Sequence, residues 1–242
     1  MQDRRFMSSS QAQAVNIDAG LRSYMLGVYN HMTIGMAITG FFAYLTKIMS
    51  VSEGMLTPFG TAIYASPLKW VIMLAPLGMV FWLSAKVQTM KPESARNLFY
   101  AFAAIMGISL SSLLLVFTGE SVIRVFFLTA ASFSALSIYG YTTKKNLTSM
   151  GSFLIMGLVG LILASIVNIF LASSAMQFII SVVGVLIFAG LTAYDTQRIK
   201  LMYMASDDRG TALKKSIMGA LTLYLDFINM FIMLLQLLGN RE

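Results

Sequence analysis

Seven stretches of the chain are apolar over a length that matches the thickness of a lipid bilayer. A helix needs about 20 apolar residues to cross the hydrocarbon core, because each residue adds about 1.5 Å. The stretches cover residues 23–46, 68–85, 97–117, 121–142, 152–173, 177–198 and 216–238. We therefore predict an all-α, polytopic membrane protein with seven transmembrane helices.

The composition excludes a soluble globular protein. Hydrophobic residues make up 57% of the 242 residues and charged residues only 11%, whereas a soluble domain carries about 25% charged residues. The lipid bilayer is therefore the predicted main partner, and the net charge of +7 indicates membrane topology rather than nucleic-acid binding. The absence of cysteine excludes disulfides, thiol catalysis and Cys-ligated metals, and we predict no cofactor.

Two parts of the chain differ in polarity. Residues 1–20 are polar and lack the apolar core of a cleavable signal peptide, so we predict a mobile N-terminal tail. Residues 21–242 contain the seven apolar stretches, joined by short connections. We find no internal repeat and no soluble domain, and we predict one transmembrane bundle over 21–242.

The basic residues predict the orientation of this bundle. With seven spans, thirteen of the 17 Lys and Arg residues fall on the side of the N-terminus and four on the other. Positive charge accumulates on the cytosolic side of membrane proteins. We therefore predict a cytosolic N-terminus and a C-terminus outside the cytosol, in an integral protein of a bacterial inner membrane.

Two acidic residues stand out because they lie within predicted spans. Of the ten Asp and Glu residues, only Asp195 and Asp226 do so. A charge at the bilayer centre costs about 3 kcal/mol on insertion scales, and such residues face the bundle interior. These two aspartates are the candidate functional residues.

Each aspartate lies on a helical stripe of small or polar residues, because the spacings alternate between three and four. The stripe in the last span consists of Gly219, Thr222, Asp226, Asn229, Met233 and Gln236. The stripe in the sixth span consists of Ser181, Gly184, Phe188, Thr192 and Asp195. Both aspartates fall in the cytosolic half of their spans, so they meet if the two helices pack together.

Two carboxyl groups in contact at a dry site cannot both ionise easily, and the pair titrates as a unit. A shared proton would hold the two helices together, and its loss would separate them or attract a cation. Calcium prefers oxygen ligands, so Asp195 and Asp226 are also the candidate residues for a transient calcium contact. The chemistry of the pair predicts a pH-dependent gate.

Other roles for the two aspartates stay open on the sequence. Asp195 precedes Arg198 by one turn and could form a solvated ion pair with it at the membrane edge. Asp226 could accept a structural hydrogen bond from Asn168, a Thr or a Ser of a neighbouring span. We take Asn168, Asn229, Thr222, Arg198 and Lys86 as candidate supporting residues.

The two segments that hold the aspartates carry a family resemblance. The sequence resembles the Bax inhibitor-1 family, also called TMBIM, in its bacterial YccA-like branch. The resemblance covers about residues 20–240 and includes Tyr-Asp-x-x-x-Ile at Tyr194, Asp-Phe-Ile-Asn at Asp226, and Asn168 in the fifth span.

The resemblance implies a bundle in which the last helix is central and is wrapped by the other six. It also implies a pH-sensitive calcium leak in which Asp195 and Asp226 match the paired aspartates of the family. Some bacterial members have an arginine near the cytosolic end of span two that latches onto the span-six aspartate. Ser84 stands at that place here, with Lys86 nearby, so the resemblance does not carry this latch over. Family members are also linked to stress survival, and bacterial relatives to a membrane AAA protease.

Three other function classes compete with a channel. An intramembrane aspartyl protease also has two aspartates on late helices, but it needs Gly-x-Gly-Asp where this chain has Leu-Tyr-Leu-Asp (223–226), and a later Pro-Ala-Leu segment, whereas no proline follows Pro92. We therefore predict no enzyme. A proton-coupled solute carrier is disfavoured by the missing repeat. A non-conducting regulator that binds another membrane protein is the remaining alternative.

Overall fold

The computed structural model of the chain describes residues 9–241, and the side chains of residues 19–241. The described part is almost wholly helical, with one two-stranded hairpin. Its elements are α1 (Ser9–Ser50), β1 (Val51–Ser52), β2 (Met55–Leu56), α2 (Pro58–Gly60), a π-helical turn (Thr61–Ala65), α3 (Leu68–Lys86), α4 (Pro92–Leu110), α5 (Leu113–Val116), α6 (Gly119–Thr142), α7 (Thr148–Leu171), α8 (Ser174–Leu201) and α9 (Arg209–Leu238).

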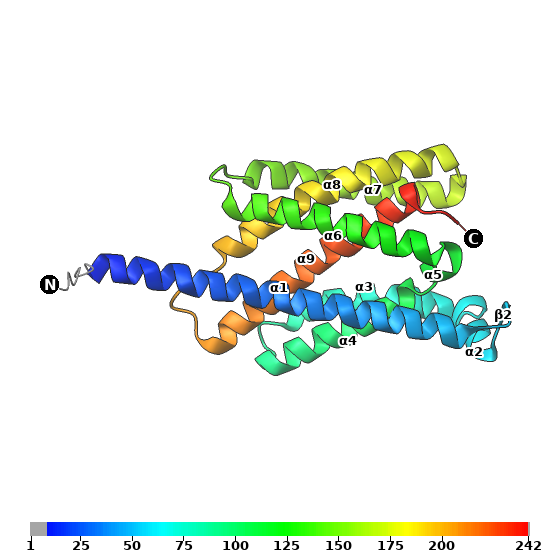
Figure 1. Ribbon diagram of the computed structural model, residues 1–242, viewed down its shortest axis with the longest axis horizontal. Coiled ribbons are helices and arrows are strands. Elements are labelled where there is room, and N and C mark those ends of the chain that lie inside the picture. Colours follow the sequence, from blue (N-terminus) through cyan, green and yellow to red (C-terminus); the bar gives the residue numbers. More distant parts are fainter. Residues whose placement is uncertain (1–8, 242) are drawn as a thin grey trace.

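The seven predicted spans are confirmed. The described residues contain seven helical segments long and apolar enough to cross a membrane. One of them, Pro92–Val116, combines α4 with α5. The start of α1 and the C-terminal end of α9 lie at opposite ends of the bundle (Figure 1), as an odd number of spans requires.

The first helix begins earlier than the first apolar stretch. α1 is 42 residues long and starts at Ser9, so residues 9–20 of the predicted polar tail are helical. Residues 1–8 of that tail lie outside the described residues. The mobility of the tail stays a prediction.

The connection between the first two spans holds structure that the sequence did not indicate. β1 and β2 pair in antiparallel fashion, with Val51 opposite Leu56. Glu53 and Gly54 turn the chain with positive φ values of 52° and 77°, which glycine adopts at little cost and glutamate only rarely. This hairpin directs the chain back toward α3.

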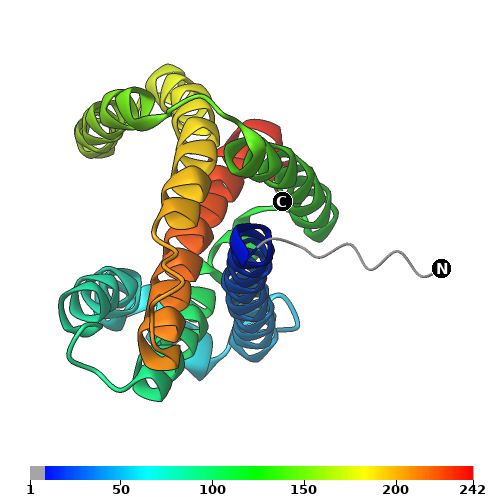
Figure 2. The same cartoon turned by 90° about the vertical axis from the view of Figure 1, so that its left-hand side faces the viewer.

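The last helix is central, as predicted, and the arrangement of its neighbours is more specific than the prediction. α9 packs on α8, α1, α6 and α4. α3 packs chiefly on α4, and α7 chiefly on α8. Figure 2, a view along the bundle, shows α3 and α7 on one side of the α8–α9 pair and α1 and α6 on the other. Four helices therefore surround α9 directly, while α3 and α7 form an outer layer.

Tyr224 joins α9 to two of these neighbours. Its side chain is fully buried, and its hydroxyl lies 2.6 Å from Oγ1 of Thr39 in α1. Thr39 in turn donates a hydrogen bond to the backbone oxygen of Ala103 in α4, at 2.8 Å. The Tyr224 ring meets Phe99 and Phe102 edge-on, with centroids 5.9 and 5.5 Å away. Such aromatic pairs stabilise a core beyond the burial of their area.

Glycines allow two pairs of helices to approach closely. A side-chain carbon on Gly140 of α6 would collide with the backbone oxygen of Ala193 in α8. One on Gly107 of α4 would collide with the backbone oxygen of Thr39 in α1. In a membrane, small residues stabilise helix pairs because they permit close van der Waals packing. Gly160 of α7, by contrast, has no other group within 4 Å of its substituent position.

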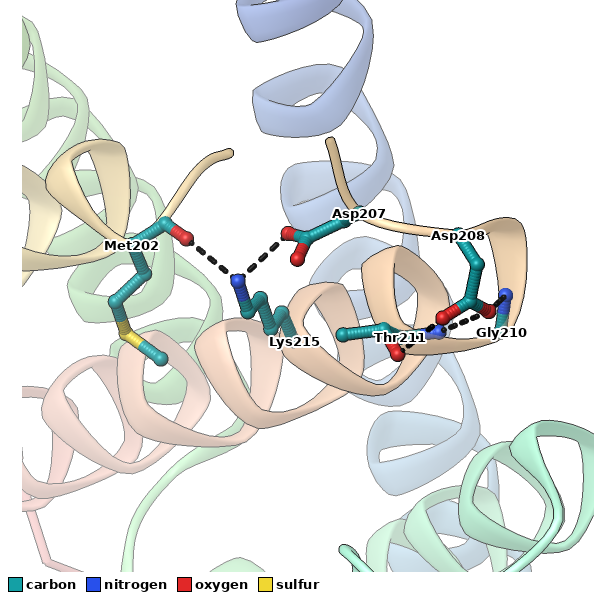
Figure 3. Close-up of polar contacts among 6 residues, drawn as sticks. All are labelled: Met202, Asp207, Asp208, Gly210, Thr211 and Lys215. Atoms are coloured by element: carbon teal, nitrogen blue, oxygen red, sulfur yellow. Dashed lines mark hydrogen bonds and ion pairs between the residues drawn. The ribbon is translucent and has the colours of Figure 1, made fainter. Parts of the chain in front are cut away.

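Two aspartates organise the loop between α8 and α9 (Figure 3). Oδ2 of Asp207 forms an ion pair with Nζ of Lys215 at 2.6 Å. The same ammonium group donates a hydrogen bond to the backbone oxygen of Met202 at 3.1 Å. Asp208 caps α9, because its Oδ1 accepts from the backbone N–H groups of Gly210 and Thr211 at 2.7 and 3.1 Å. Lys215 therefore ties the end of α8 to the first turns of α9.

We predict that Gly140→Ala destabilises the bundle, because the new methyl group meets backbone rather than a movable side chain. The expected loss is about 1–3 kcal/mol, the usual cost of overpacking. Thermal unfolding of the purified protein in detergent measures it. Gly160→Ala is the matched control and leaves the unfolding temperature unchanged or raises it slightly. Equal unfolding temperatures for both variants would contradict the close packing of α6 on α8.

We predict that the Asp208 cap contributes to the stability of the folded protein and that this contribution depends on pH. The hydroxyl of Thr211 and the backbone N–H groups of Thr211 and Gly210 hold the pKa of Asp208 below its usual range. A lowered pKa in the folded state stabilises that state fully above the unfolded value of about 3.9, and this stabilisation is lost as the pH falls through the folded value. Asp208→Ala should therefore lower the unfolding temperature at neutral pH, and the difference from the wild type should shrink in acid.

Asp208→Asn is the control for this measurement. Asparagine also caps helices, but it does not titrate. This variant should lose less unfolding temperature on acidification than the wild type does. An identical acid response of the wild type and Asp208→Asn would refute the titrating cap.

Candidate functional site

The two helices that carry the buried aspartates, α8 and α9, pack against each other in antiparallel fashion. Two contacts define their register. Near one end, Oγ of Ser181 lies 3.0 Å from Oε1 of Gln236. Near the other end, a substituent on Gly219 would lie 2.9 Å from Cγ2 of Ile199. Between these contacts the same small and polar stripes identified from the sequence face each other.

This register brings Asp195 and Asp226 together. Counting along both helices from these two contacts puts Asp195 at the level of Thr222, and Asp226 one helical turn further along α9, an offset of about 6 Å along the helix axis. Side chains of a helix lean toward its N-terminus. Since the two N-termini lie at opposite ends, the two aspartates lean toward each other across this offset. They are only 7% and 5% exposed.

The two carboxyl groups have different surroundings. Oδ1 of Asp195 lies 3.8 Å from Nη1 of Arg198, whose side chain is 61% exposed. The ion pair expected as one alternative for Asp195 is therefore present, although it is long. Oδ2 of Asp226 is buried and has no hydrogen-bond partner among the described residues. Asp226 is thus the more isolated of the two groups.

Two of the proposed supporting residues flank the pair but do not bind it. Oγ1 of Thr222 donates to the backbone oxygen of Met218 at 3.1 Å. Nδ2 of Asn229 donates to the backbone oxygen of Leu225 at 2.8 Å. Both side chains therefore satisfy the backbone of their own helix, a common role of polar residues in apolar surroundings.

Asn168 and Lys86 lie apart from the aspartates. Asn168 donates to Gln177 at 3.3 Å and accepts from the backbone of Ser173 at 3.1 Å, at the far end of the bundle. The structural hydrogen bond that we considered between Asn168 and Asp226 is therefore absent. Lys86 ends α3, and the ion pairs among the described residues are those of Asp195 with Arg198 and of Asp207 with Lys215.

A second polar cluster joins the same two helices at their other end. Nε2 of Gln177 in α8 donates to Oε1 of Gln236 in α9 at 2.6 Å. These two amides, with Asn168, Ser181 and Arg241, line a cavity of about 440 Å³. Gln236 belongs to the predicted stripe, but the sequence did not indicate the cavity, because Gln177 and Arg241 lie outside the two stripes.

A hydrogen-bond chain next to Asp195 also escaped the sequence analysis. The hydroxyls of Tyr29 in α1 and Ser137 in α6 lie 2.5 Å apart, and Oγ of Ser137 lies 2.9 Å from Oγ1 of Thr196 in α8. Thr196 then donates to the backbone oxygen of Thr192 at 2.7 Å. Three helices thus meet beside Asp195 through hydroxyl groups that have no common motif in the sequence.

The site can hold a proton or, briefly, a cation. Within the described part of the chain, no three His, Cys, Asp or Glu side chains lie together, so the acids at this site are Asp195 and Asp226. Calcium usually takes six to eight oxygen ligands, and two carboxylates supply only some of them. The arrangement therefore fits a transient contact better than a resident metal.

The comparisons with known proteins agree with this architecture. The chain matches the family described as "Inhibitor of apoptosis-promoting Bax1" over residues 21–242. It is 43% identical to the inner membrane protein YbhL of Escherichia coli over 227 residues, which covers 93% of this chain and 94% of the relative. It is 46% identical to an uncharacterised protein of Caulobacter vibrioides, over 94% of this chain and 93% of that protein. An uncharacterised protein of Rickettsia prowazekii is also 46% identical, over 93% and 92% of the two chains. Matches of this extent, together with seven membrane-spanning helices around a central α9, show that the chain belongs to the Bax inhibitor-1 family.

Proposed function

We propose that this membrane protein is a pH-sensitive leak for calcium, with Asp195 and Asp226 as its proton sensor and gate. The observation that carries the proposal is the burial of both carboxyl groups between α8 and α9. An ionisable residue inside a membrane bundle is costly and is typical of ion or proton pathways. No enzyme is proposed.

The gate would work through the charge of the pair. A proton on Asp226 leaves at most one negative charge in the pair, so the two helices can pack closely. When this proton leaves, two negative charges lie side by side in a site of low dielectric constant, where their repulsion is strong. The repulsion favours separation of α8 from α9, and the two carboxylates then attract a divalent cation.

Arg198 would modulate this gate. Its guanidinium lies 3.8 Å from Asp195 and extends into solvent, so it compensates only part of a charge on that carboxylate. Asp226 has no such partner among the described residues. We therefore expect the gate to depend more on the protonation of Asp226, the residue on the central helix, than on the protonation of Asp195.

The polar cavity at Gln177 and Gln236 supports the proposal that a cation enters between α8 and α9 from the end of the bundle opposite to the aspartates. Its amide and hydroxyl oxygens are neutral ligands of the type that replace the hydration shell of a cation, whereas the guanidinium of Arg241, which also lines the cavity, opposes a cation. It lies between the same two helices as the aspartates. A path that opens along α8 and α9 would connect this cavity to Asp226.

The orientation belongs to the proposal. Of the 15 Lys and Arg residues that the structure describes, eleven fall on the side where α1 starts, which is the proposed cytosolic side. The relative YbhL is named an inner membrane protein, and we propose a bacterial inner membrane for this chain as well. Asp195 and Asp226 would then sense the pH of the cytosolic half of the bundle.

Calcium flux into liposomes that contain the purified protein tests this function. For the wild type we expect flux to rise by about tenfold between about pH 6 and pH 8, since about 1.4 kcal/mol of charge repulsion changes an equilibrium tenfold. Asp195→Asn and Asp226→Asn should each remove this pH dependence, because a single carboxylate has no partner to repel.

Glu93→Gln is the matched control. Glu93 is an exposed acid in the first turn of α4, so this variant should keep the pH response of the wild type. Folded wild-type protein that passes no calcium at any pH would refute the leak. The alternative is then a non-conducting regulator that binds another membrane protein, such as a membrane AAA protease in a stress response. Retention of that binding in the Asp195→Asn, Asp226→Asn double variant would support it.

A further inference from the structure

A long groove runs between α1 and α6, away from the outer helices. The backbones of these two helices stay apart, although both pack on α9. One part of the groove, about 650 Å³, lies between Arg22 and Tyr141. A second part, about 320 Å³, reaches Lys47. The two parts share Met36 and Phe126 in their linings, so they adjoin each other along α1 and α6, and we call them together the α1–α6 groove.

The floor and the rim of the groove are apolar. Phe227 and Phe231 of α9 contribute to the floor. At the rim, Leu26 of α1 and Ile138 of α6 are 59% and 64% exposed. Since α1, α6 and α9 all span the membrane, the open side of this groove faces lipid. Water has few hydrogen-bond partners there, so an apolar occupant is favoured.

The charges on the groove lie at its two ends. Arg22 and Lys47 are the charged residues of the lining, and no acidic residue lines either part. Neither of these two side chains forms an ion pair within the described part of the chain. A separation of 25 residues along α1 corresponds to about 38 Å of helix. A bilayer is about 30 Å thick in its hydrocarbon core and about 40–45 Å with its head groups.

The two basic residues are therefore spaced about as far apart along α1 as the two layers of lipid phosphates are. We propose that the α1–α6 groove binds the acyl chains of membrane phospholipids, one from each leaflet, with the phosphate of one lipid at Arg22 and that of the other at Lys47. The acyl chains follow the apolar floor and meet near Met36 and Phe126. Flexible methionines such as Met36 adapt to a chain of variable shape.

This site is separate from the proposed gate. None of its lining residues is Asp195 or Asp226, so lipid binding does not depend on whether the protein conducts calcium. Its wall does reach the hydroxyl chain beside Asp195, since both Tyr29 and Ser137 line the groove.

Native mass spectrometry of the full-length protein, released from nanodiscs of dioleoylphosphatidylglycerol and dioleoylphosphatidylcholine, tests the proposal. We expect the wild type to retain phosphatidylglycerol. Ala130→Trp places a large ring in the groove, because Ala130 lines it, and should reduce retention by about tenfold. Ala131→Trp is the matched control: Ala131 is exposed on the same helix outside the groove lining, and this variant should retain lipid like the wild type.

A second pair of variants tests the proposal even if Ala130→Trp fails to fold. The double variant Arg22→Gln, Lys47→Gln should lose its preference for phosphatidylglycerol over phosphatidylcholine. Lys144→Gln removes an exposed basic residue that lies outside the groove lining and should keep that preference. Equal retention of phosphatidylglycerol by Ala130→Trp and Ala131→Trp, or an unchanged preference in the double variant, would overturn the proposal. So would a dimer that carries no lipid and that Ala130→Trp breaks, because a second copy would then occupy the groove.

Discussion

The bilayer offers no solvent for polar groups, and the structure is arranged around this constraint. α9 carries Asp226, whose Oδ2 has no hydrogen-bond partner among the described residues, and each unsatisfied polar group in hydrocarbon costs several kcal/mol. The face of α9 that holds Asp226 must therefore be covered by protein rather than by lipid. α8, α1, α6 and α4 supply that cover, and the remaining two spans need only to pack on α4 and α8. The central place of α9 follows from where its polar residues lie.

The sequence allowed the spans and the aspartate pair to be predicted, because both depend on local patterns. Each apolar run is long enough to cross a bilayer, and the helical spacing assigns Asp195 and Asp226 to one face each. What the spacing could not give is which helix covers which face. All seven spans are apolar, and hydropathy alone does not distinguish α3 and α7, which lie outside, from α4 and α6, which touch α9.

Side-chain partners were the least predictable part of the site. Asn168 seemed a suitable donor to Asp226 because both are polar residues of spans. In the folded chain it lies beside Gln177, at the opposite end of α8 from Asp195. The position of a residue along its span decides the depth at which it can act, and that depth depends on where each helix begins in the membrane. The chain of Tyr29, Ser137 and Thr196 was missed for the same reason, since its hydroxyls come from three spans that are far apart in sequence.

The difference between the two aspartates has a physical consequence. A buried carboxyl group without a partner reduces stability, and a residue of similar shape without charge would remove this cost. Asp226 occupies such a position on the most enclosed helix, whereas Asp195 has a guanidinium at 3.8 Å. Natural sequences keep local conflicts of this kind chiefly at functional sites. The conflict at Asp226, more than the presence of two acids, is thus the strongest structural argument that the α8–α9 interface has a role beyond packing.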